Sequence, residues 1–356
     1  MWPMSEPVLV AGLDIGGTKT LAVAVDAAQA ATAWPSGDGA PRPEVVAMVR
    51  RPTGAGGGER LLRSTAGVLA DLAHAAGVPV DGFAAIGVGV PGLVDRAAGT
   101  VRHAVNLGVD DTPLGLADHL RAAARAPVVV DNDVNLAAVG AAVALGCHGD
   151  LAYLSVGTGL AAGLLLDGRI RRGAHGAAGE IGHLPIDPQG PWCECGQRGC
   201  LEALASGAAI AGRWPAGDGA ASAASSLLAA VAAGDAAAVT VLDDVAGYLA
   251  GAVALLAQTV DPELVVLGGG VAEAGPGLLD AVRGALRVRA DGSPVLAAIG
   301  LADRVALVPR DVPAGALGAA VYARHRVRSD DPAPVAPVTA PGSTSLAAND
   351  VASGTS

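Results

Sequence analysis

Two segments of the sequence share one form, in which an apolar run, a glycine turn and a second apolar run follow one another. They are LDIGGTKTLAVAV (13–25) and LSVGTGLAAGLLL (154–166), about 140 residues apart. Each is typical of a strand, a turn and a second strand, and the pair suggests a weak internal duplication. Such turns expose backbone N–H groups that can bind an anion. Two duplicated turns that face each other across a cleft would bind two phosphates of one nucleotide.

Strands alternate with helices along most of the chain, which predicts an α/β fold. The segment 29–43 is rich in turn residues and predicts a poorly constrained connection, and 329–356 predicts a disordered tail because it has few large apolar residues. The expected strands lie in 7–26, 44–50, 82–92, 150–170, 262–270 and 304–310, and the expected helices lie in 57–77, 201–213, 235–260, between 270 and 304, and up to about 325. In 126–146 a strand is expected to run directly into a helix.

Composition and charge exclude several classes of partner. The 356 residues are 51% hydrophobic, which is enough for two buried cores. The net charge of −11 is spread thinly and no run of Lys or Arg could follow a phosphate backbone, so we expect no binding to nucleic acid or to anionic membranes. Apolar stretches are interrupted by Gly, Asp or Pro before about 18 residues, the length that a membrane span needs. We therefore expect a cytoplasmic enzyme, without a helix-turn-helix before the first strand.

The first glycine turn, GGTKT, is not the end of a P-loop. That motif has Gly before its Lys and a helix after it, whereas Thr18 precedes Lys19 here and an apolar strand follows. Asp14 ends the preceding strand, where a buried carboxylate is costly unless it serves a cation or a hydrogen-bond network. Our hypothesis is that Asp14 orients Mg²⁺ or its waters, and the alternative is an N-capping Asp in a tight hairpin.

A second polar group stands where a strand becomes a helix, in VVVDNDVNLAAVG (128–140). Asp is a good N-cap, so a simple cap is one explanation. The other is a ligand site, because the carboxyl end of a buried strand is where α/β sheets bind ligands. The sequence leaves both open for its four polar residues, which are Asp131, Asn132, Asp133 and Asn135.

Three of the four cysteines fall within eight residues of one loop. Cys193, Cys195 and Cys200 follow His183, and together they form the Cys₃His set of a closed, structural zinc site. Three clustered thiols cannot pair evenly as disulfides, and the Pro, Gly, Gln and Arg around them offer no apolar core. The loop therefore predicts zinc, whereas Cys147 lies apart and is expected to be a small core residue.

The motifs DIGGTK, VPG, NDVN, GTG, GEIGH, CECGQRGCLE and LGGG, in this order and at these separations, resemble the ROK family (repressors, open reading frames and sugar kinases) of the actin-like ATPase superfamily. The resemblance covers roughly residues 8–325. It implies two actin-like (ribonuclease H-like) α/β domains around a nucleotide and sugar cleft. These are an N-terminal domain at 7–130, a C-terminal domain at 131–310, a final helix at 311–326 that returns to the N-terminal domain, and a tail at 327–356.

The resemblance also implies ATP-dependent phosphorylation of a hexose on its 6-hydroxyl, with Mg²⁺, structural Zn²⁺ and a homodimeric or homotetrameric assembly. Asp133 matches the catalytic base. A carboxylate in this position suits a primary hydroxyl, which needs a proton acceptor to attack the γ-phosphoryl group. The implied sugar contacts are Asn106, Asn132, Asp133, Glu180, His183 and Glu202, and the implied nucleotide contacts are Asp14, Gly16, Gly17, Thr18, Lys19, Gly157, Thr158, Gly159, Gly269 and Gly270.

Other functions stay open at this point. Within the kinases, glucose is the first choice, followed by an N-acetylhexosamine or fructose, and a polyphosphate donor fits less well than ATP. The family's usual aromatic residue after NLG is Val109 here, and the second turn is poorer in glycine than most. A sugar-sensing ROK regulator without kinase activity is the alternative of another class. A non-catalytic sugar-binding module would not need Asp133 together with two phosphate turns.

Overall fold

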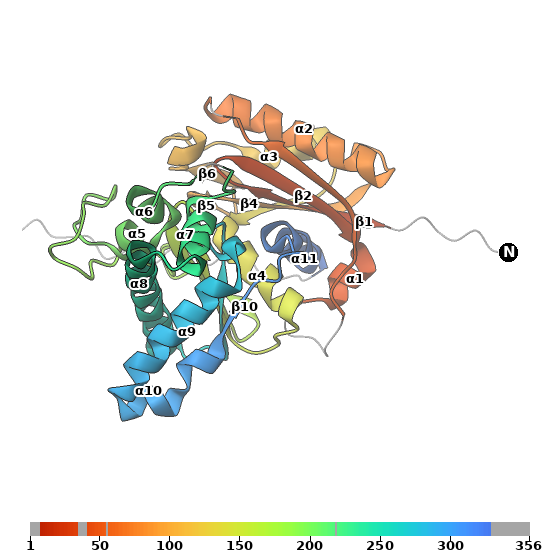
Figure 1. Cartoon of the computed structure of the whole chain (residues 1–356). Helices are drawn as coiled ribbons and strands as arrows, with labels where there is room; N and C mark the ends of the chain where they lie inside the picture. Colours follow the sequence, from red (N-terminus) through yellow and green to blue (C-terminus); the bar gives the residue numbers. More distant parts are fainter. Residues whose placement is uncertain (1–7, 35–40, 55, 218, 329–356) are drawn as a thin grey trace, which may run out of the picture.

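Two five-stranded sheets, each accompanied by helices, form the protein (Figure 1). The structure is a computed structural model that describes residues 8–34, 41–54, 56–217 and 219–328. The first sheet has the order β3-β2-β1-β4-β7 and the second has the order β10-β9-β8-β11-β12. The first is built from β1 (Leu9–Ile15), β2 (Lys19–Asp26), β3 (Val45–Pro52), β4 (Phe83–Val90) and β7 (Val128–Asn132), and the second from β8 (Leu151–Val156), β9 (Leu160–Leu166), β10 (Arg169–Ile170), β11 (Leu264–Gly268) and β12 (Val305–Leu307).

The two sheets repeat one topology, which confirms the duplication seen in the sequence. In the first sheet β1 pairs antiparallel with β2 and parallel with β4, and in the second β8 pairs antiparallel with β9 and parallel with β11. Each glycine turn connects the antiparallel pair at the centre of its sheet. The boundary expected at residues 130/131 falls inside β7, and the next helix links the two sheets.

Eleven α-helices occur in the described residues. They are α1 (Ala27–Thr32), α2 (Gly58–Ala76), α3 (Leu116–Ala124), α4 (Asp133–Leu145), α5 (Leu201–Ala205), α6 (Gly207–Arg213), α7 (Ala223–Ala232), α8 (Ala236–Val260), α9 (Pro276–Asp291), α10 (Pro294–Ile299) and α11 (Ala314–Arg328). Helices α2 and α3 cover one face of the first sheet and α11 lies against the other (Figure 1). Strand β1 alternates accordingly, since Leu9, Ala11 and Leu13 join the core under α2 and α3.

Several elements differ from the sequence-based expectation. The turn-rich segment 29–43 contributes to α1, and Trp34 is buried, while residues 35–40 lie outside the described part. The helix expected at 201–213 is two helices, because Ser206 ends α5 and its hydroxyl accepts a hydrogen bond from Ala209 N–H to cap α6. A small hairpin of β5 (Leu93–Asp95) and β6 (Thr100–Arg102) was not predicted. The expected tail beyond residue 328 also lies outside the described residues.

Helix α11 is in direct backbone contact with its neighbours. A Cβ atom added at Gly87 in β4 would lie 1.9 Å from the carbonyl oxygen of Ala319, and one added at Gly318 would lie 1.8 Å from that of Leu136 in α4. Gly12 in β1 and Gly140 in α4 are equally close to the helix. Only glycine allows such an approach, so these positions fix α11 against the first sheet and α4.

Helix α8 is the one described helix that is long and apolar enough to cross a membrane, with half of its most apolar window buried. Its sequence is interrupted by Asp243, Asp244, Gly247 and Gly251, as expected, although none of these residues ends the helix. Its buried side chains, among them Leu242, Val245 and Leu249, belong to the core of the second sheet. Core helices of globular proteins commonly have this composition.

Candidate active site

The first glycine turn lies between β1 and β2, and Asp14 precedes it. The turn is closed by a 2.9 Å hydrogen bond from Gly16 N–H to the Lys19 carbonyl oxygen. Asp14 faces the first turn of α11, since a Cβ added at Gly315 would lie 2.4 Å from its Oδ2 atom. Burial, and then the negative charge of Asp133, raise the pKa of Asp14 to about 7, while Lys19 acts in the opposite direction. Asp14 and Asp133 therefore lie in one electrostatic site.

Asp14 does not act as a capping residue. Among the described residues no hydrogen bond to the Asp14 carboxylate occurs, and the residue is only partly exposed. An acidic side chain that is buried to this degree without a hydrogen-bond partner is costly, and a cation would offset that cost. The carboxylate oxygens of Asp14 suit Mg²⁺, which in proteins usually keeps several water ligands and binds one or two carboxylates.

In the β7–α4 junction one residue caps the helix and the next residue is the candidate base. Asn132 caps α4, because its Oδ1 accepts hydrogen bonds from Val134 N–H at 3.0 Å and Asn135 N–H at 3.3 Å. Asp133 is the first residue of the helix and its carboxylate is left free of this role. Burial raises the pKa of Asp133 to about 6, although hydrogen bonds from the backbone N–H groups of Val134 and Asp133 act in the opposite direction, and the charge of Glu180 raises it further. Asn132 keeps its Nδ2 group for a ligand, and Asp133 keeps a carboxylate suited to accept a proton.

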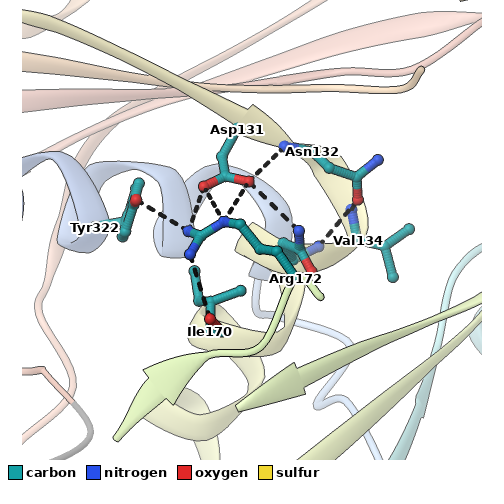
Figure 2. A network of polar contacts seen from close by, with 7 residues as sticks. Asp131, Asn132, Val134, Ile170, Arg172 and Tyr322 are labelled. Carbon is teal, nitrogen blue, oxygen red and sulfur yellow. Dashed lines mark hydrogen bonds and ion pairs between the residues drawn. The ribbon is translucent and has the colours of Figure 1, made fainter. Parts of the chain in front are cut away.

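Asp131, just before these residues, forms a buried ion pair that the sequence did not indicate. Figure 2 shows its carboxylate against the guanidinium of Arg172, which also contacts Tyr322 of α11. Arg172 lies 41 residues from Asp131 and Tyr322 lies 150 residues from Arg172. No local pattern joins such distant residues, so sequence reasoning missed both partners.

The segment GEIGH lies beside β9, close to Glu202 of α5. Gly182 approaches the Leu160 carbonyl oxygen so closely that an added Cβ would be 1.9 Å from it. Glu202 Oε2 accepts a 2.8 Å hydrogen bond from Leu160 N–H. One oxygen of Glu202 thus binds the backbone at the start of β9, just after the second glycine turn. The other oxygen can bind a ligand.

Asn106 lies at the first glycine turn. It belongs to a short 3₁₀ helix, Val105–Leu107, and a Cβ added at Gly17 would be 3.2 Å from the Cβ of Asn106. Val109, which replaces the expected aromatic residue, is buried. A predicted sugar contact and a predicted phosphate turn are therefore neighbours.

The second glycine turn and the LGGG segment contact each other through their backbones. Gly157 N–H donates to the Gly159 carbonyl at 3.0 Å, and Val271 N–H donates to the Val156 carbonyl at 2.9 Å. Gly269 has a φ of +82°, and an added Cβ would lie 2.7 Å from the Val156 oxygen. The described residues place Thr158 and Gly270 in these same turns, between β8 and β9 and directly after β11.

An ion pair connects the end of the first glycine turn with the segment that follows LGGG. Lys19 Nζ lies 3.8 Å from Glu273 Oε1, and both side chains are exposed. Lys19 follows the first glycine turn, and Glu273 belongs to the short helix Ala272–Ala274 that follows LGGG. Surface pairs of this kind contribute little stability, about 0–1 kcal/mol. The ion pair does show that the nucleotide-binding segments predicted on the two sheets lie close to each other.

The zinc ligands predicted from the sequence gather at one point. The ligand atoms of His183, Cys193, Cys195 and Cys200 all lie within 4.8 Å of one another. His183 Nδ1 is 3.7 Å from Cys193 Sγ, and Cys195 Sγ is 3.6 Å from Cys200 Sγ. Zn–S bonds of about 2.3 Å in a tetrahedron give S···S edges of roughly 3.8 Å, so this set fits zinc. The Nδ1 atom faces the thiols, which leaves Nε2 of His183 for another partner.

The loop around these ligands is held by its own hydrogen bonds. Cys193 N–H donates to the Gln197 carbonyl at 2.8 Å, and Gly196 N–H donates to the Cys193 carbonyl at 2.9 Å. A hydrogen bond from the Gln197 backbone lowers the pKa of Cys195 to about 6, which favours the thiolate that a metal binds. Cys147 lies apart, with its Sγ 3.9 Å from the Gly149 carbonyl oxygen.

Comparison with known proteins decides the family. The ROK family model matches residues 10–326. The chain belongs to the ROK family. The fold is accordingly the actin-like ATPase fold of ROK kinases.

Among relatives of this ROK protein, the glucokinase of Halalkalibacterium halodurans is 39% identical over 217 residues, which are 56% of this chain and 64% of that protein. The xylose repressor of Caldicellulosiruptor bescii is 40% identical over 154 residues, 43% of this chain and 38% of the repressor. The chain thus spans less than two thirds of either relative.

Solved structures cover more of the ROK chain. The ROK hexokinase of Thermus thermophilus is 34% identical, with a TM-score of 0.68 over 90% of this chain and 99% of that one. The ROK family glucokinase of Streptomyces griseus, in complex with glucose and AMPPNP, is 29% identical, with a TM-score of 0.70 over 89% of this chain and 99% of that one.

Proposed function

We propose that this ROK protein is an ATP-dependent hexokinase that transfers the γ-phosphoryl group to the 6-hydroxyl of a hexose, with glucose as the first candidate. The observation that carries the proposal is the position of Asp133. Its carboxylate is not used as a helix cap, has a pKa raised to about 6, and shares one electrostatic site with Asp14 and Glu180. The glucokinase and hexokinase relatives support the same reaction.

In the proposed reaction Asp133 accepts the proton of the 6-hydroxyl as its oxygen attacks the γ-phosphorus. The bond from that phosphorus to the bridging oxygen of ATP breaks, and ADP leaves with its electron pair. A pKa of about 6 suits this role, because the carboxylate is ionised at neutral pH and still basic enough to take a proton. The products are the hexose 6-phosphate, ADP and the proton on Asp133.

The other side chains bind and orient the two substrates. Glu180 and the free oxygen of Glu202 suit vicinal sugar hydroxyls, which carboxylates bind through charge-assisted hydrogen bonds. Asn132 Nδ2 and Asn106 would add contacts to the sugar. The backbone N–H groups of the two glycine turns would bind phosphate oxygens, and Gly269 and Gly270 would lie beside the adenosine.

Two metals have residues that fit them. Asp14 would hold Mg²⁺ or its waters beside the phosphates, where a divalent cation shares the charge that develops on them. Four protein ligands leave no open position for catalysis, so His183, Cys193, Cys195 and Cys200 would hold zinc for a structural purpose. With Nδ1 directed to that site, His183 carries its proton on Nε2 and can donate it to a sugar hydroxyl.

The test is an ADP-release assay with Mg-ATP across glucose, fructose, mannose, N-acetylglucosamine and N-acetylmannosamine. We expect glucose to give the highest kcat/KM. Asp133→Asn should bind glucose while its turnover falls by about 10²–10⁴-fold. The matched control is Asp26→Asn, because Asp26 caps α1 and Asn caps a helix equally well. Near-normal turnover of Asp133→Asn would contradict the base, and a tenfold preference for an N-acetylhexosamine would contradict glucose.

A sugar-sensing regulator is the second candidate, favoured by the likeness to the xylose repressor. It predicts that the wild-type chain binds a sugar but releases no ADP with any member of the panel. The intact set of Asp133, two glycine turns and Asp14 argues for the kinase.

A further inference from the structure

A buried polar network joins three elements that lie far apart in the chain (Figure 2). The Nε atom of Arg172 lies 3.2 Å from Asp131 Oδ1 and 3.0 Å from Oδ2, and its Nη2 atom donates to the same carboxylate and, at 2.9 Å, to the Tyr322 hydroxyl. Nη1 donates to the Ile170 carbonyl at 3.3 Å. Asp131 belongs to β7, Arg172 follows β10, and Tyr322 belongs to α11.

The carboxylate of Asp131 is saturated from the side of the candidate active site as well. Its Oδ1 atom accepts a 2.8 Å hydrogen bond from the N–H of Asn132 and lies 3.4 Å from Asn135 Nδ2. Both donors belong to the β7–α4 junction that presents Asp133. The conformation of this junction therefore depends on where Asp131, and hence Arg172, holds that carboxylate.

Arg172 also stands at the base of the loop that leads to Glu180. The Arg172 carbonyl accepts a 3.0 Å hydrogen bond from Ala178 N–H, which closes the loop two residues before Glu180. Strands β7 and β10 are edge strands of the two sheets. One guanidinium thus connects the junction on the first sheet, which presents Asp133, with the loop on the second sheet that leads to Glu180, and the charge of Glu180 raises the pKa of Asp133.

Fold stability alone is a poor explanation for this network. The Asp131 side chain is 2% exposed and that of Arg172 is 18% exposed. Desolvating two charges to this extent offsets most of their attraction, and apolar replacements of buried ion pairs are often neutral or stabilising. A two-pronged ion pair does fix the position of the two segments that carry its partners relative to each other, because the planar guanidinium fits the carboxylate in one orientation.

We propose that Arg172 is a positioning residue for phosphoryl transfer: through Asp131 it sets the β7–α4 junction, and with it Asp133, relative to the loop that carries Glu180. Tyr322 supports the guanidinium from α11, with the Arg172 Cζ atom 5.5 Å from its ring centroid. The proposal rests on the proposed hexokinase function, since it concerns the alignment of base and sugar. It assigns no direct substrate contact to any of the three residues.

The test compares Arg172→Met with Arg171→Met. Arg171 is the neighbouring residue, and it pairs with Asp167 at the surface. We expect Arg172→Met to lower kcat by at least tenfold and to weaken glucose binding in calorimetry, while the KM for ATP changes less than twofold. Arg171→Met should match the wild type in all three. Arg172→Lys keeps the charge but not the two-pronged geometry, so it should recover folding more than kcat.

A double variant separates position from an unpaired charge. Asp131→Asn/Arg172→Met leaves no buried charge without a partner and should fold, yet its kcat should remain at least tenfold low. Full recovery of kcat in the double variant, or a folded Arg172→Met with wild-type kcat and glucose affinity, would overturn the proposal. Wild-type protein in the same assays tests the function separately: glucose binding without ADP release would refute the kinase, whereas an active wild type with unaffected variants refutes only the positioning role.

Discussion

Replacing Asp14 with Asn should stabilise the protein at alkaline pH while it removes activity. In the folded state the pKa of Asp14 is raised from 3.8 to about 7, mainly by burial. Each pKa unit corresponds to about 1.4 kcal/mol, so the ionised carboxylate opposes folding by up to roughly 4 kcal/mol. Asn has a similar shape and carries no charge to desolvate.

The pH dependence follows from the direction of the shift. Between pH 4 and pH 7 the unfolded state has Asp14 ionised while the folded state keeps it protonated, so folding takes up a proton. The contribution of this group to the free energy of unfolding is therefore fully present below about pH 4 and is lost as the pH rises through about 7. Asp14→Asn should match the wild type at or below about pH 4, exceed it by about 1.4 kcal/mol more for each pH unit up to about pH 7, and keep that margin at higher pH.

Thermal unfolding from pH 5 to pH 8.5, in buffer without Mg²⁺ or nucleotide, measures this difference. A gain of this size raises Tm by several degrees, at roughly 2–4 °C per kcal/mol for a domain of about 200 residues. Asp26→Asn is the matched control and should leave the pH profile unchanged. An Asp14→Asn variant that is less stable than the wild type at pH 8, or a difference that does not change with pH, would refute the reasoning.

Three further changes probe other parts of the molecule. The kcat/KM of the wild type should fall about tenfold per pH unit below a pH of about 6, because Asp133 must be ionised to accept a proton, and a flat profile down to pH 5 would contradict its role. Cys195→Ser should lose bound zinc, as measured by mass spectrometry, and should weaken glucose binding more than ATP binding, because the zinc loop also holds His183 and leads directly into α5. Loss of zinc with unchanged glucose affinity would contradict this coupling. Gly87→Ala should lower the free energy of unfolding by about 1–3 kcal/mol or more, since its Cβ would meet the Ala319 carbonyl, and a wild-type denaturation midpoint would refute the close approach.

The parts of the site that could be predicted are those in which the chemistry is local in sequence. The zinc ligands lie within 18 residues of one another, and their types alone suggest the metal. The two glycine turns and the β7–α4 junction are also continuous segments, so their strand, turn and helix signals could be read directly. The candidate base could be placed on this junction for the same reason.

The sequence could not separate the roles of neighbouring polar residues in the β7–α4 junction. Whether Asn132 or Asp133 caps α4 depends on backbone angles, and the structure assigns the cap to Asn132. The partner of Asp131 was hidden because Arg172 belongs to the other sheet. Helix α1 was missed because its six residues are mostly Ala beside a Pro- and Gly-rich stretch, and its stability comes from packing on α11 and from the Asp26 cap.

The glycine-lined contacts of α11 also determine when the first half of the protein can finish folding. The first sheet is complete in sequence at Asn132, yet the helix that fills its second face begins at Ala314. At synthesis rates of about 5–20 residues per second, roughly 10–40 seconds separate the emergence of these two segments from the ribosome. During that time Gly12 and Gly87 line a face of the sheet whose covering helix does not yet exist. The N-terminal half can therefore build the core under α2 and α3 from its own residues, whereas the core on the opposite face of its sheet has to wait for α11.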